Sequence, residues 1–309
     1  MHIVMTGGTG FIGRSLCVSL CQEGHRVTLI TRRREDAQRL FGSTVTVVEW
    51  NGQETGAWEH CLEDAEAVIN LAGAPIADGR WSESRKRLLT ESRVLTTRLL
   101  VEAMSRYCAK PRTLVSASGI GYYGASDDRV LDENAARGQG FLADLCLAWE
   151  AEALRAAEFD VRVVMLRTGM VLEQDGGALL KMLLPFKLFT GGPIMPGTQW
   201  VSWIHRRDHI GLTQWALSTP SVSGPVNVVA PEAVTMNRFC AGLGQVLHRP
   251  SWLPVPGFAL SLALGELGTL MTTGQRVNPA KALSGGYVFH YPTLEPALRA
   301  IVTKRSLRV

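Results

Sequence analysis

Hydroxyl-bearing side chains gather in the stretch VSASGIGYYG, residues 115–124, which follows an apolar run typical of a buried strand. Ser118, Tyr122 and Tyr123 stand close enough in sequence to act in one site. Their hydroxyl groups can orient a substrate hydroxyl or carry a proton to and from it, which is general acid–base catalysis. We predict that these three residues are catalytic. The alternative for the two tyrosines is packing, with each hydroxyl hydrogen-bonded inside the protein.

A glycine-rich turn, TGGTGFIG at residues 6–13, lies between a first apolar strand and a helical pattern. Gly7 permits a tight turn, Gly10 lets the backbone approach a pyrophosphate, and Gly13 lets the helix pack closely on the strand. The start of the helix adds unpaired N–H groups and a positive dipole end, which attract phosphate. The pattern predicts a dinucleotide site, with a ligand-free glycine turn as the alternative.

The end of the second predicted strand, TRRRED at residues 31–36, indicates which dinucleotide is bound. An NAD site usually has Asp or Glu here to bind the ribose hydroxyls, whereas an arginine pairs with the 2′-phosphate of NADP. Thr31 and Arg32 come first in this chain, so the sequence predicts NADP(H), with Arg32 on the phosphate. The alternative is a solvated basic turn, and we expect Arg33 and Arg34 to face water.

Strand and helix patterns alternate along the chain, and this alternation supplies the scaffold for both sites. It predicts an α/β Rossmann-type fold, a doubly wound parallel sheet with a small C-terminal substrate lobe. The expected strands are 2–6, 26–31, 44–50, 66–73, 112–118, 161–169 and 224–231, and the expected helices are 11–24, 82–106, 141–157 and a helical region over 235–309. We divide the chain into an NADP-binding core, 1–170, and a mixed region, 171–309, which returns one strand to the core and forms the lobe.

Composition excludes several classes of function. The chain has 309 residues, of which 46% are apolar, enough for a large core. Its formal net charge of +4 and its 7% of aromatic residues give no basic, aromatic-lined surface, so no nucleic-acid partner is expected. The cysteines form no C-x-x-C pair and have no His-rich companion segment, so no metal site is predicted.

The chain shows no sign of export or of a membrane span. HIVMTGG enters a strand directly, without the charged and apolar regions of a signal peptide. The most apolar late segment, 258–271, is shorter than a membrane span and carries Glu266, so we expect a buried helix. We therefore predict a cytoplasmic protein with no membrane partner. It binds an unidentified small molecule, and a homodimer is one option.

Several motifs together resemble those of the short-chain dehydrogenase/reductase superfamily, on its extended, epimerase/dehydratase-like side. They are TGGTGFIG, NLAG (70–73), SASGIGYYG, LRTGMVL (166–172), WIHRRD (203–208) and GPVNVV (224–229). Longer segments, INLAGAPIADGRW, LLPFKLFTGGPIMPG and TGQRVNPAKALSGGYVF, resemble the atypical branch called "epimerase family protein". The resemblance spans nearly the whole chain and implies a Rossmann-type core that binds NADP(H).

The resemblance also implies which residues contact the cofactor. The turn would hold the pyrophosphate, the end of the second strand the adenosine phosphate, and the NLAG turn the adenine and ribose, while two further residues would lie near the nicotinamide. In that order they are Gly7, Thr9, Gly10, Phe11, Ile12 and Gly13; Thr31 and Arg32; Leu71, Ala72 and Gly73; and Arg93 and Val171.

This chain departs from the superfamily at its usual proton relay. Relatives commonly carry Tyr-x-x-x-Lys on a helix, where the lysine lowers the pKa of the tyrosine. Here Phe141 or Leu142 and then Leu145 or Cys146 occupy those places. Our leading hypothesis is an NADP(H)-dependent oxidoreductase or epimerase-like enzyme whose proton transfer falls to the 115–124 stretch or to water. The alternatives are an NADP(H)-binding sensor without turnover and an interaction scaffold.

Two other segments have both a functional and a structural interpretation. His205 and Asp208 in WIHRRD could supply acid–base groups, or they could order the core and the following helix. GGPIMPG, residues 191–197, could be a substrate-covering loop or a set of tight turns.

Overall fold

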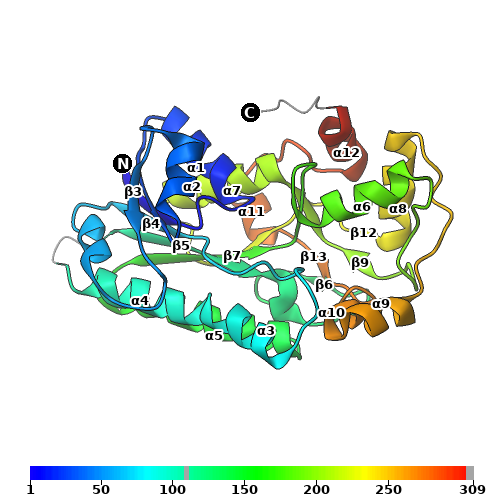
Figure 1. Ribbon diagram of the computed structural model, residues 1–309, viewed down its shortest axis with the longest axis horizontal. Helices are drawn as coiled ribbons and strands as arrows, with labels where there is room; N and C mark the ends of the chain where they lie inside the picture. The colour runs from blue at the N-terminus through cyan, green and yellow to red at the C-terminus, as the bar shows by residue number, and fades with distance from the viewer. Residues whose placement is uncertain (108–110, 304–309) are drawn as a thin grey trace.

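A seven-stranded parallel sheet forms the centre of the molecule in the computed structural model, which describes residues 1–107 and 111–303 (Figure 1). The strand order is β11-β7-β5-β4-β1-β2-β3. The strands are β1 (His2–Thr6), β2 (Arg26–Thr31), β3 (Thr46–Glu49), β4 (Ala67–Asn70), β5 (Thr113–Gly119), β7 (Arg162–Thr168) and β11 (Gly224–Val228). The predicted Rossmann-type fold is confirmed.

The sheet reverses its winding beside β1, and this reversal fixes where a ligand can bind. Ile3 pairs in parallel register with Val27 of β2 on one side and with Ala67 of β4 on the other. The chain moves outward from β1 in both directions, so the connections after β1 and β4 diverge. They leave a crevice at the carboxyl ends of these strands, where open α/β sheets bind ligands.

Helices cover both faces of the sheet because its apolar strands are buried on both sides. On one face, α1 (Gly13–Gln22), α2 (Arg34–Phe41) and α7 (Arg206–Ser218) pack against side chains such as Met5 and Ile69. The other face is covered by α4 (Val94–Ser105) and α5 (Phe141–Leu154), with α3 (Glu83–Glu91) alongside, as Figure 1 shows. The core therefore lies in two layers, one above and one below the sheet.

The helix expected over 82–106 is two helices, α3 and α4, which is a correction to the prediction. The break falls at Ser92 and Arg93, whose side chains bond the surrounding backbone. Ser92 accepts the N–H of Ala74 at 3.0 Å, and Arg93 donates to the Ala74 carbonyl at 2.8 Å. Side chains of this kind compete with the helical hydrogen bonds and tie the chain to the loop after β4.

The C-terminal lobe packs around Trp203, Phe186 and Phe239, which are fully buried or nearly so. Its main helices are α6 (Gly177–Lys187), α8 (Met236–Leu247) and α12 (Leu294–Thr303). Short strand pairs join it to the core: β6 (Val130–Leu131) with β13 (Arg276–Val277), β8 (Met170–Leu172) with β10 (Trp203–His205), and β9 (Trp200–Val201) with β12 (Val234–Thr235). The short helices are η1 (Ala57–Leu62), η2 (Ile120–Tyr123), η3 (Arg155–Phe159) and α11 (Ala280–Ser284).

The segment expected as one buried helix, 258–271, also differs from the prediction. It forms α9 (Gly257–Leu264) and α10 (Glu266–Leu270), separated by Gly265 with a φ of 63°. None of the residues of α9 is buried. The region 235–309 is likewise several helices with β13 among them, and residues 304–309 lie outside the described chain. No helix in the described ranges is long and apolar enough to cross a membrane.

Candidate functional site

The glycine turn has the shape of a phosphate cradle. Gly7 has a φ of 71°, and its carbonyl accepts the N–H of Gly10 at 3.0 Å. A Cβ on Gly7 would stand 2.5 Å from the Leu71 carbonyl oxygen, and one on Gly13 would overlap the Gly7 carbonyl oxygen. No side chain caps the start of α1 at Ile12. The turn is therefore bare backbone at a helix N-terminus, which fits the pyrophosphate of a dinucleotide.

A cavity of about 530 Å³ opens beside this turn, at the end of β2. It is lined by Thr9, Thr31, Arg32, Arg33, Asp36, Arg39 and Leu40. Asp36 is already paired with Arg33 and Arg39. Arg32 has no carboxylate partner in residues 1–107 and 111–303, and its charge is left for an anion.

Arg32 also lines a second cavity, of about 330 Å³. Trp50 and Trp58 stack there with ring centroids 4.0 Å apart, and Asn51 lies beside them. The two cavities give the end of β2 room for a phosphate and for a flat ring, as the adenosine end of a dinucleotide requires. Arg33 and Arg34 are exposed, as expected.

The loop after β4 carries Leu71, Ala72 and Gly73 along the same edge of the sheet. Arg93 packs beneath it, because a Cβ on Gly73 would stand 3.0 Å from the Arg93 guanidinium carbon. Arg93 is only 7% exposed and donates to the carbonyls of Ala74 and Leu89. Burial lowers its pKa to about 10, and no carboxylate among the described residues pairs with it. Arg93 is thus a buried cation next to the predicted cofactor groove.

The loop between β8 and α6 closes over Phe11. A Cβ on Gly176 would overlap the Phe11 ring, and the guanidinium of Arg206 lies 5.2 Å from the centre of that ring. Asp175 accepts from Arg14 at 2.5 Å and from Arg206 at 2.7 Å. This double ion pair ties the loop to the first turns of α1 and α7. Val171, in the strand that leads into the loop, is buried.

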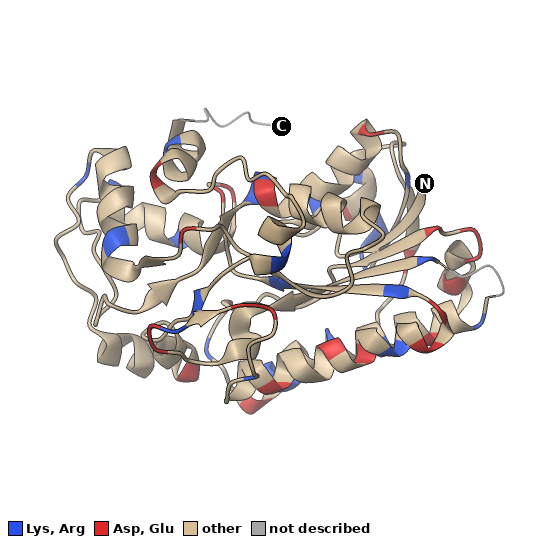
Figure 2. Ribbon diagram, turned by 180° about the vertical axis from the view of Figure 1, so that it is seen from behind, with Lys and Arg blue, Asp and Glu red and all other residues tan. Residues whose placement is uncertain are grey.

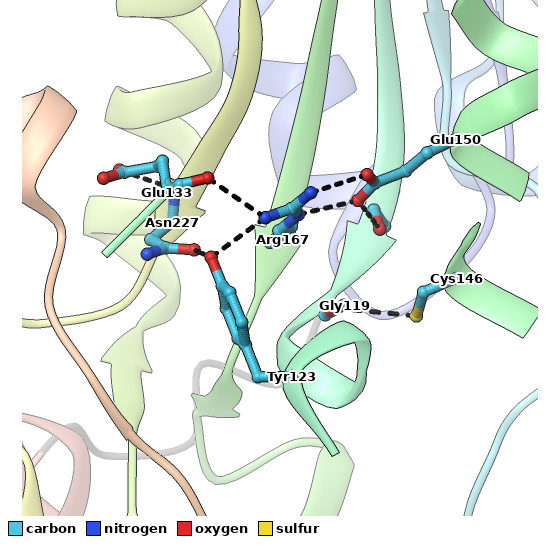
Figure 3. Close-up of polar contacts among 8 residues, drawn as sticks. Gly119, Tyr123, Glu133, Cys146, Glu150, Arg167 and Asn227 are labelled. Atoms are coloured by element: carbon cyan, nitrogen blue, oxygen red, sulfur yellow. Dashed lines mark hydrogen bonds and ion pairs between the residues drawn. The ribbon is translucent and has the colours of Figure 1, made fainter. Parts of the chain in front are cut away.

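Ser118 and Tyr123 of the 115–124 stretch lie inside a buried polar network (Figure 3). The Ser118 hydroxyl donates to Glu150 Oε1 at 2.7 Å, and Arg167 binds both oxygens of the same carboxylate at 2.8 Å. Arg167 Nη1 also donates to the Tyr123 hydroxyl at 3.1 Å, and that hydroxyl donates to Asn227 Oδ1 at 2.7 Å. Both hydroxyls therefore have fixed structural partners.

Arg167 and Glu150 stabilise each other's charged forms in this network. Burial lowers the pKa of Arg167, but the hydrogen bonds and negative charge of Glu150 outweigh it and raise the pKa overall. Burial raises the pKa of Tyr123, which is 3% exposed, and Arg167 opposes the rise only in part. A phenol in this setting holds its proton. The catalytic role of Ser118 and Tyr123 stays a prediction that this geometry does not favour.

Tyr122 differs from its neighbour. Its ring lies 3.5 Å from the guanidinium carbon of Arg167, and its side chain is half-buried. Its hydroxyl makes no hydrogen bond to any residue of the described chain. Of the three predicted hydroxyls, this one remains available to a ligand.

The face of α5 where a proton relay was sought is apolar. Leu142 lies against Gly121, and the Cys146 thiol donates to the Gly119 carbonyl at 3.6 Å. Burial raises the pKa of Cys146 to about 11, so it stays a thiol at neutral pH. At the start of α5, Phe141, Leu142 and Leu145 pack with Trp81 and Leu267 in one apolar cluster.

WIHRRD and GGPIMPG, which had both a functional and a structural interpretation, have structural roles in the described chain. His205 Nδ1 accepts the N–H of Arg207 at the start of α7. Asp208 accepts the N–H groups of His290 and Tyr291 at 2.7 and 2.9 Å, which holds the C-terminal region to α7. In GGPIMPG, a Cβ on the first glycine would overlap the Phe186 ring, so this glycine serves close packing.

Sequence reasoning missed the four partners that organise the 115–124 stretch, namely Glu133, Glu150, Arg167 and Asn227. Glu133 accepts the N–H of Asn227 at 3.0 Å and that of Lys281 at 3.2 Å. A signal was present, because Arg167 and Glu150 are charged residues inside apolar runs. Buried charges are rare unless they are paired, so two of them in adjacent elements predict each other.

The sheet order, the bare glycine turn and the arginine-lined cavity define a nucleotide-binding α/β protein. Two family models match the chain: residues 3–229 match the NAD dependent epimerase/dehydratase family, and residues 255–301 match a domain of unknown function, DUF1731. The chain belongs to the NAD dependent epimerase/dehydratase family, which confirms the resemblance found in the motifs.

Relatives and solved structures place it more narrowly. It is 42% identical to a chloroplastic homologue of epimerase family protein SDR39U1 from Arabidopsis thaliana, over 98% of this chain and 87% of that protein. It is 39% identical to epimerase family protein YfhF of Bacillus subtilis, over 99% of each. The crystal structure of human epimerase family protein SDR39U1 with NADPH superposes with a TM-score of 0.88 at 33% identity, over 99% of this chain and 100% of that one.

Proposed function

We propose that this protein is an NADP(H)-dependent oxidoreductase or epimerase-like enzyme acting on a small molecule. One observation carries the choice of cofactor: Arg32, without a carboxylate partner in the described ranges, lines a cavity of about 530 Å³ beside the glycine turn. The human relative crystallised with NADPH supports the same choice. A cytoplasmic location and a homodimer belong to the proposal as well, and the free cysteines of the described chain support a reducing compartment.

The residues of the groove divide the work of binding. Gly7, Gly10 and Gly13 would receive the pyrophosphate, and Arg32 the adenosine 2′-phosphate. Bound NADP(H) supplies a hydride donor or acceptor, and the protein supplies position and proton transfer. Tyr122 is the hydroxyl left for proton transfer, because it follows the carboxyl end of β5 and no residue of the described chain engages its oxygen.

A second candidate function is an NADP(H)-binding sensor without turnover. Two observations favour it. The hydroxyls of Ser118 and Tyr123 are held in the buried network, and the face of α5 that would carry a relay has Leu142 and Cys146. A sensor needs the nucleotide groove and a response to its redox state, but no proton relay.

Cofactor choice is tested by titrating NADPH and NADH against wild-type protein and Arg32→Ala. We expect Arg32→Ala to weaken NADPH by roughly 10- to 100-fold and NADH by little, since a charged hydrogen bond to phosphate contributes about 1.5–3 kcal/mol. Arg34→Ala, which removes a nearby exposed arginine, is the matched control and should leave both affinities unchanged. Equal losses for NADPH and NADH in Arg32→Ala would show that this arginine does not read the phosphate.

Turnover is tested by following NADPH absorbance across carbonyl compounds and sugar nucleotides, with wild-type protein and Tyr122→Phe. The enzyme proposal expects NADPH oxidation or, for an epimerase, which causes no net oxidation, an isomerised product with at least one compound, and a rate loss of about 100-fold or more in Tyr122→Phe. Tight NADPH binding with neither oxidation nor a new product supports the sensor instead.

A further inference from the structure

One end of the C-terminal lobe carries large apolar side chains that no residue of the described chain covers. Leu184 and Leu188 at the end of α6 are 61% and 63% exposed, and Phe189 is 53% exposed. Trp252 is 64% exposed, and Phe258 and Leu262, one turn apart on α9, are 78% and 80% exposed. These six residues are named the apolar end below.

Hydrogen bonds tie the segment after α6 to the segment that leads into α9. The Trp252 indole N–H donates to the Phe189 carbonyl at 3.0 Å, which links the end of α6 to the segment before α9. The N–H of Met195 donates to the Val255 carbonyl at 2.9 Å, and Met195 itself is 43% exposed. In Figure 1, α6, α8 and α9 all lie toward the end of the molecule opposite β3, with α9 below the other two.

The two segments that carry the apolar end contain cations and no acid. Residues 176–198 and 245–265 contain Lys181, Lys187 and Arg249, and no Asp or Glu. Lys181 pairs with Asp78 at 3.4 Å, whereas Lys187 and Arg249 have no carboxylate partner among the described residues. The Arg249 guanidinium lies 4.4 Å from the centre of the Phe189 ring, so one cation is part of the surface itself. Figure 2 shows α9 without any charged residue; Glu266, the first acid after it, pairs with Lys86 at 2.7 Å.

This charge pattern selects the partner. In a symmetric pair of copies the same patch faces itself, so Lys187 and Arg249 would meet the same cations of the other copy, and the two segments offer no acid to pair them. An anionic lipid surface offers both requirements at once: negative headgroups for Lys187 and Arg249, and an apolar layer for the aromatic and aliphatic side chains. Tryptophan and phenylalanine are suited to this boundary, and large exposed apolar patches mark interaction sites.

We propose that the apolar end docks the protein on an anionic lipid bilayer, with α9 lying in the interface. The contact is peripheral and reversible, and it needs no membrane-spanning helix. The proposal departs from the expectation of no membrane partner, which rested on composition and on the length of apolar segments rather than on how exposed side chains are arranged.

The test is co-sedimentation of the full chain, loaded with NADPH, with vesicles of phosphatidylcholine alone or mixed with phosphatidylglycerol. We expect binding to the mixed vesicles at low salt, and at least about tenfold weaker binding to phosphatidylcholine or at high salt. The double variant Phe258→Asp/Leu262→Asp should bind the mixed vesicles at least about tenfold more weakly. Lys187→Glu should weaken binding to the mixed vesicles by about fivefold or more and should not change binding to phosphatidylcholine vesicles.

The matched control is Val288→Asp, which places the same charge on a side chain that is 83% exposed outside the apolar end. It should bind vesicles as the wild type does, and NADPH affinity should be unchanged in all variants, which shows that they are folded. The proposal is overturned if the mixed vesicles bind no protein, if neutral vesicles bind equally well, or if the double variant binds like the wild type. It is also overturned if sedimentation velocity shows a dimer that the double variant abolishes, since the apolar end is then a contact between copies.

Discussion

Tyr122 and Tyr123 are adjacent in the candidate site, but their surroundings differ. The Tyr123 hydroxyl bonds both Arg167 and Asn227 in the core, whereas the Tyr122 hydroxyl has no partner in the described chain. Removing a hydroxyl that satisfies a buried cation leaves that cation's N–H without its acceptor, and the cost exceeds that of the lost bond alone.

Tyr123→Phe should therefore lower the free energy of unfolding by roughly 1–3 kcal/mol, while Tyr122→Phe should lower it by less than about 0.5 kcal/mol. Urea unfolding of the two single variants measures the difference. Equal losses would mean that the hydroxyl of Tyr123 does not contribute through this network.

The Arg167–Glu150 pair makes a second residue-level prediction. Both side chains are at most 5% exposed, so a single change leaves a buried charge alone. Glu150→Leu should cost roughly 3–5 kcal/mol of stability, whereas the double variant Glu150→Leu/Arg167→Met should cost clearly less, since both charges are then gone. A double-mutant cycle by chemical denaturation tests this. Additive losses would show that the two groups are not coupled.

At the level of elements, α1 depends on glycine at both ends, through a positive φ at Gly7 and Gly24 and through the absence of a Cβ at Gly13. Gly7 needs a positive φ, Gly13 needs the absence of a Cβ, and Gly24 ends the helix with a φ of 82° and open space around it. Crowding and conformational strain differ in cost, so substitution separates them.

Gly13→Ala should abolish NADPH binding, because its Cβ would overlap the Gly7 carbonyl and push the turn away from the phosphate position. Gly24→Ala should cost only about 1 kcal/mol of stability and leave binding intact. Calorimetric titration with thermal unfolding distinguishes the two outcomes. NADPH affinity retained in Gly13→Ala would show that the turn is not the phosphate cradle.

The sequence predicted the strands and the glycine turn of the core well because their signals are local. Apolar runs of β-branched residues marked the strands within a few residues, and the glycine spacing marked the turn. The break at Arg93 and the split at Gly265 were missed because tertiary contacts decide them: carbonyls of the loop after β4 in the first case, packing of α10 on Trp81 in the second. The network around Arg167 was missed because its members come from strands and helices far apart in sequence.

For the whole molecule, α7 joins the core to the C-terminal region. Its Asp208 holds the backbone at residues 290–291, and the next residue, His209, is 1% exposed and bonds the Thr168 hydroxyl at 3.1 Å at the end of β7. Burial lowers the pKa of His209 to about 4 from its ordinary 6.5. The folded chain therefore keeps this imidazole neutral where the unfolded chain would protonate it.

Lowering the pH should therefore lower the stability of the fold. Above pH 6.5 neither state is protonated at His209 and its titration has no effect; between 6.5 and about 4 the unfolded state binds the extra proton, so acid favours unfolding. The loss from this group reaches up to about 3 kcal/mol. His209→Gln, which keeps an N–H donor but cannot titrate, should flatten that part of the pH–stability curve. An unchanged slope would assign the acid sensitivity to other groups.

The carboxylate of Glu133 has a consequence for the order in which the protein is made. It accepts N–H groups from residues 94 and 148 positions further along the chain, and β11, which covers the outer edge of β7, also comes late. During synthesis the first 170 residues leave the ribosome with an open sheet edge and with a Glu133 carboxylate that lacks its native N–H donors. The early half of the chain therefore cannot complete its sheet until the late half has been made. Premature termination should yield a fragment that aggregates by edge pairing.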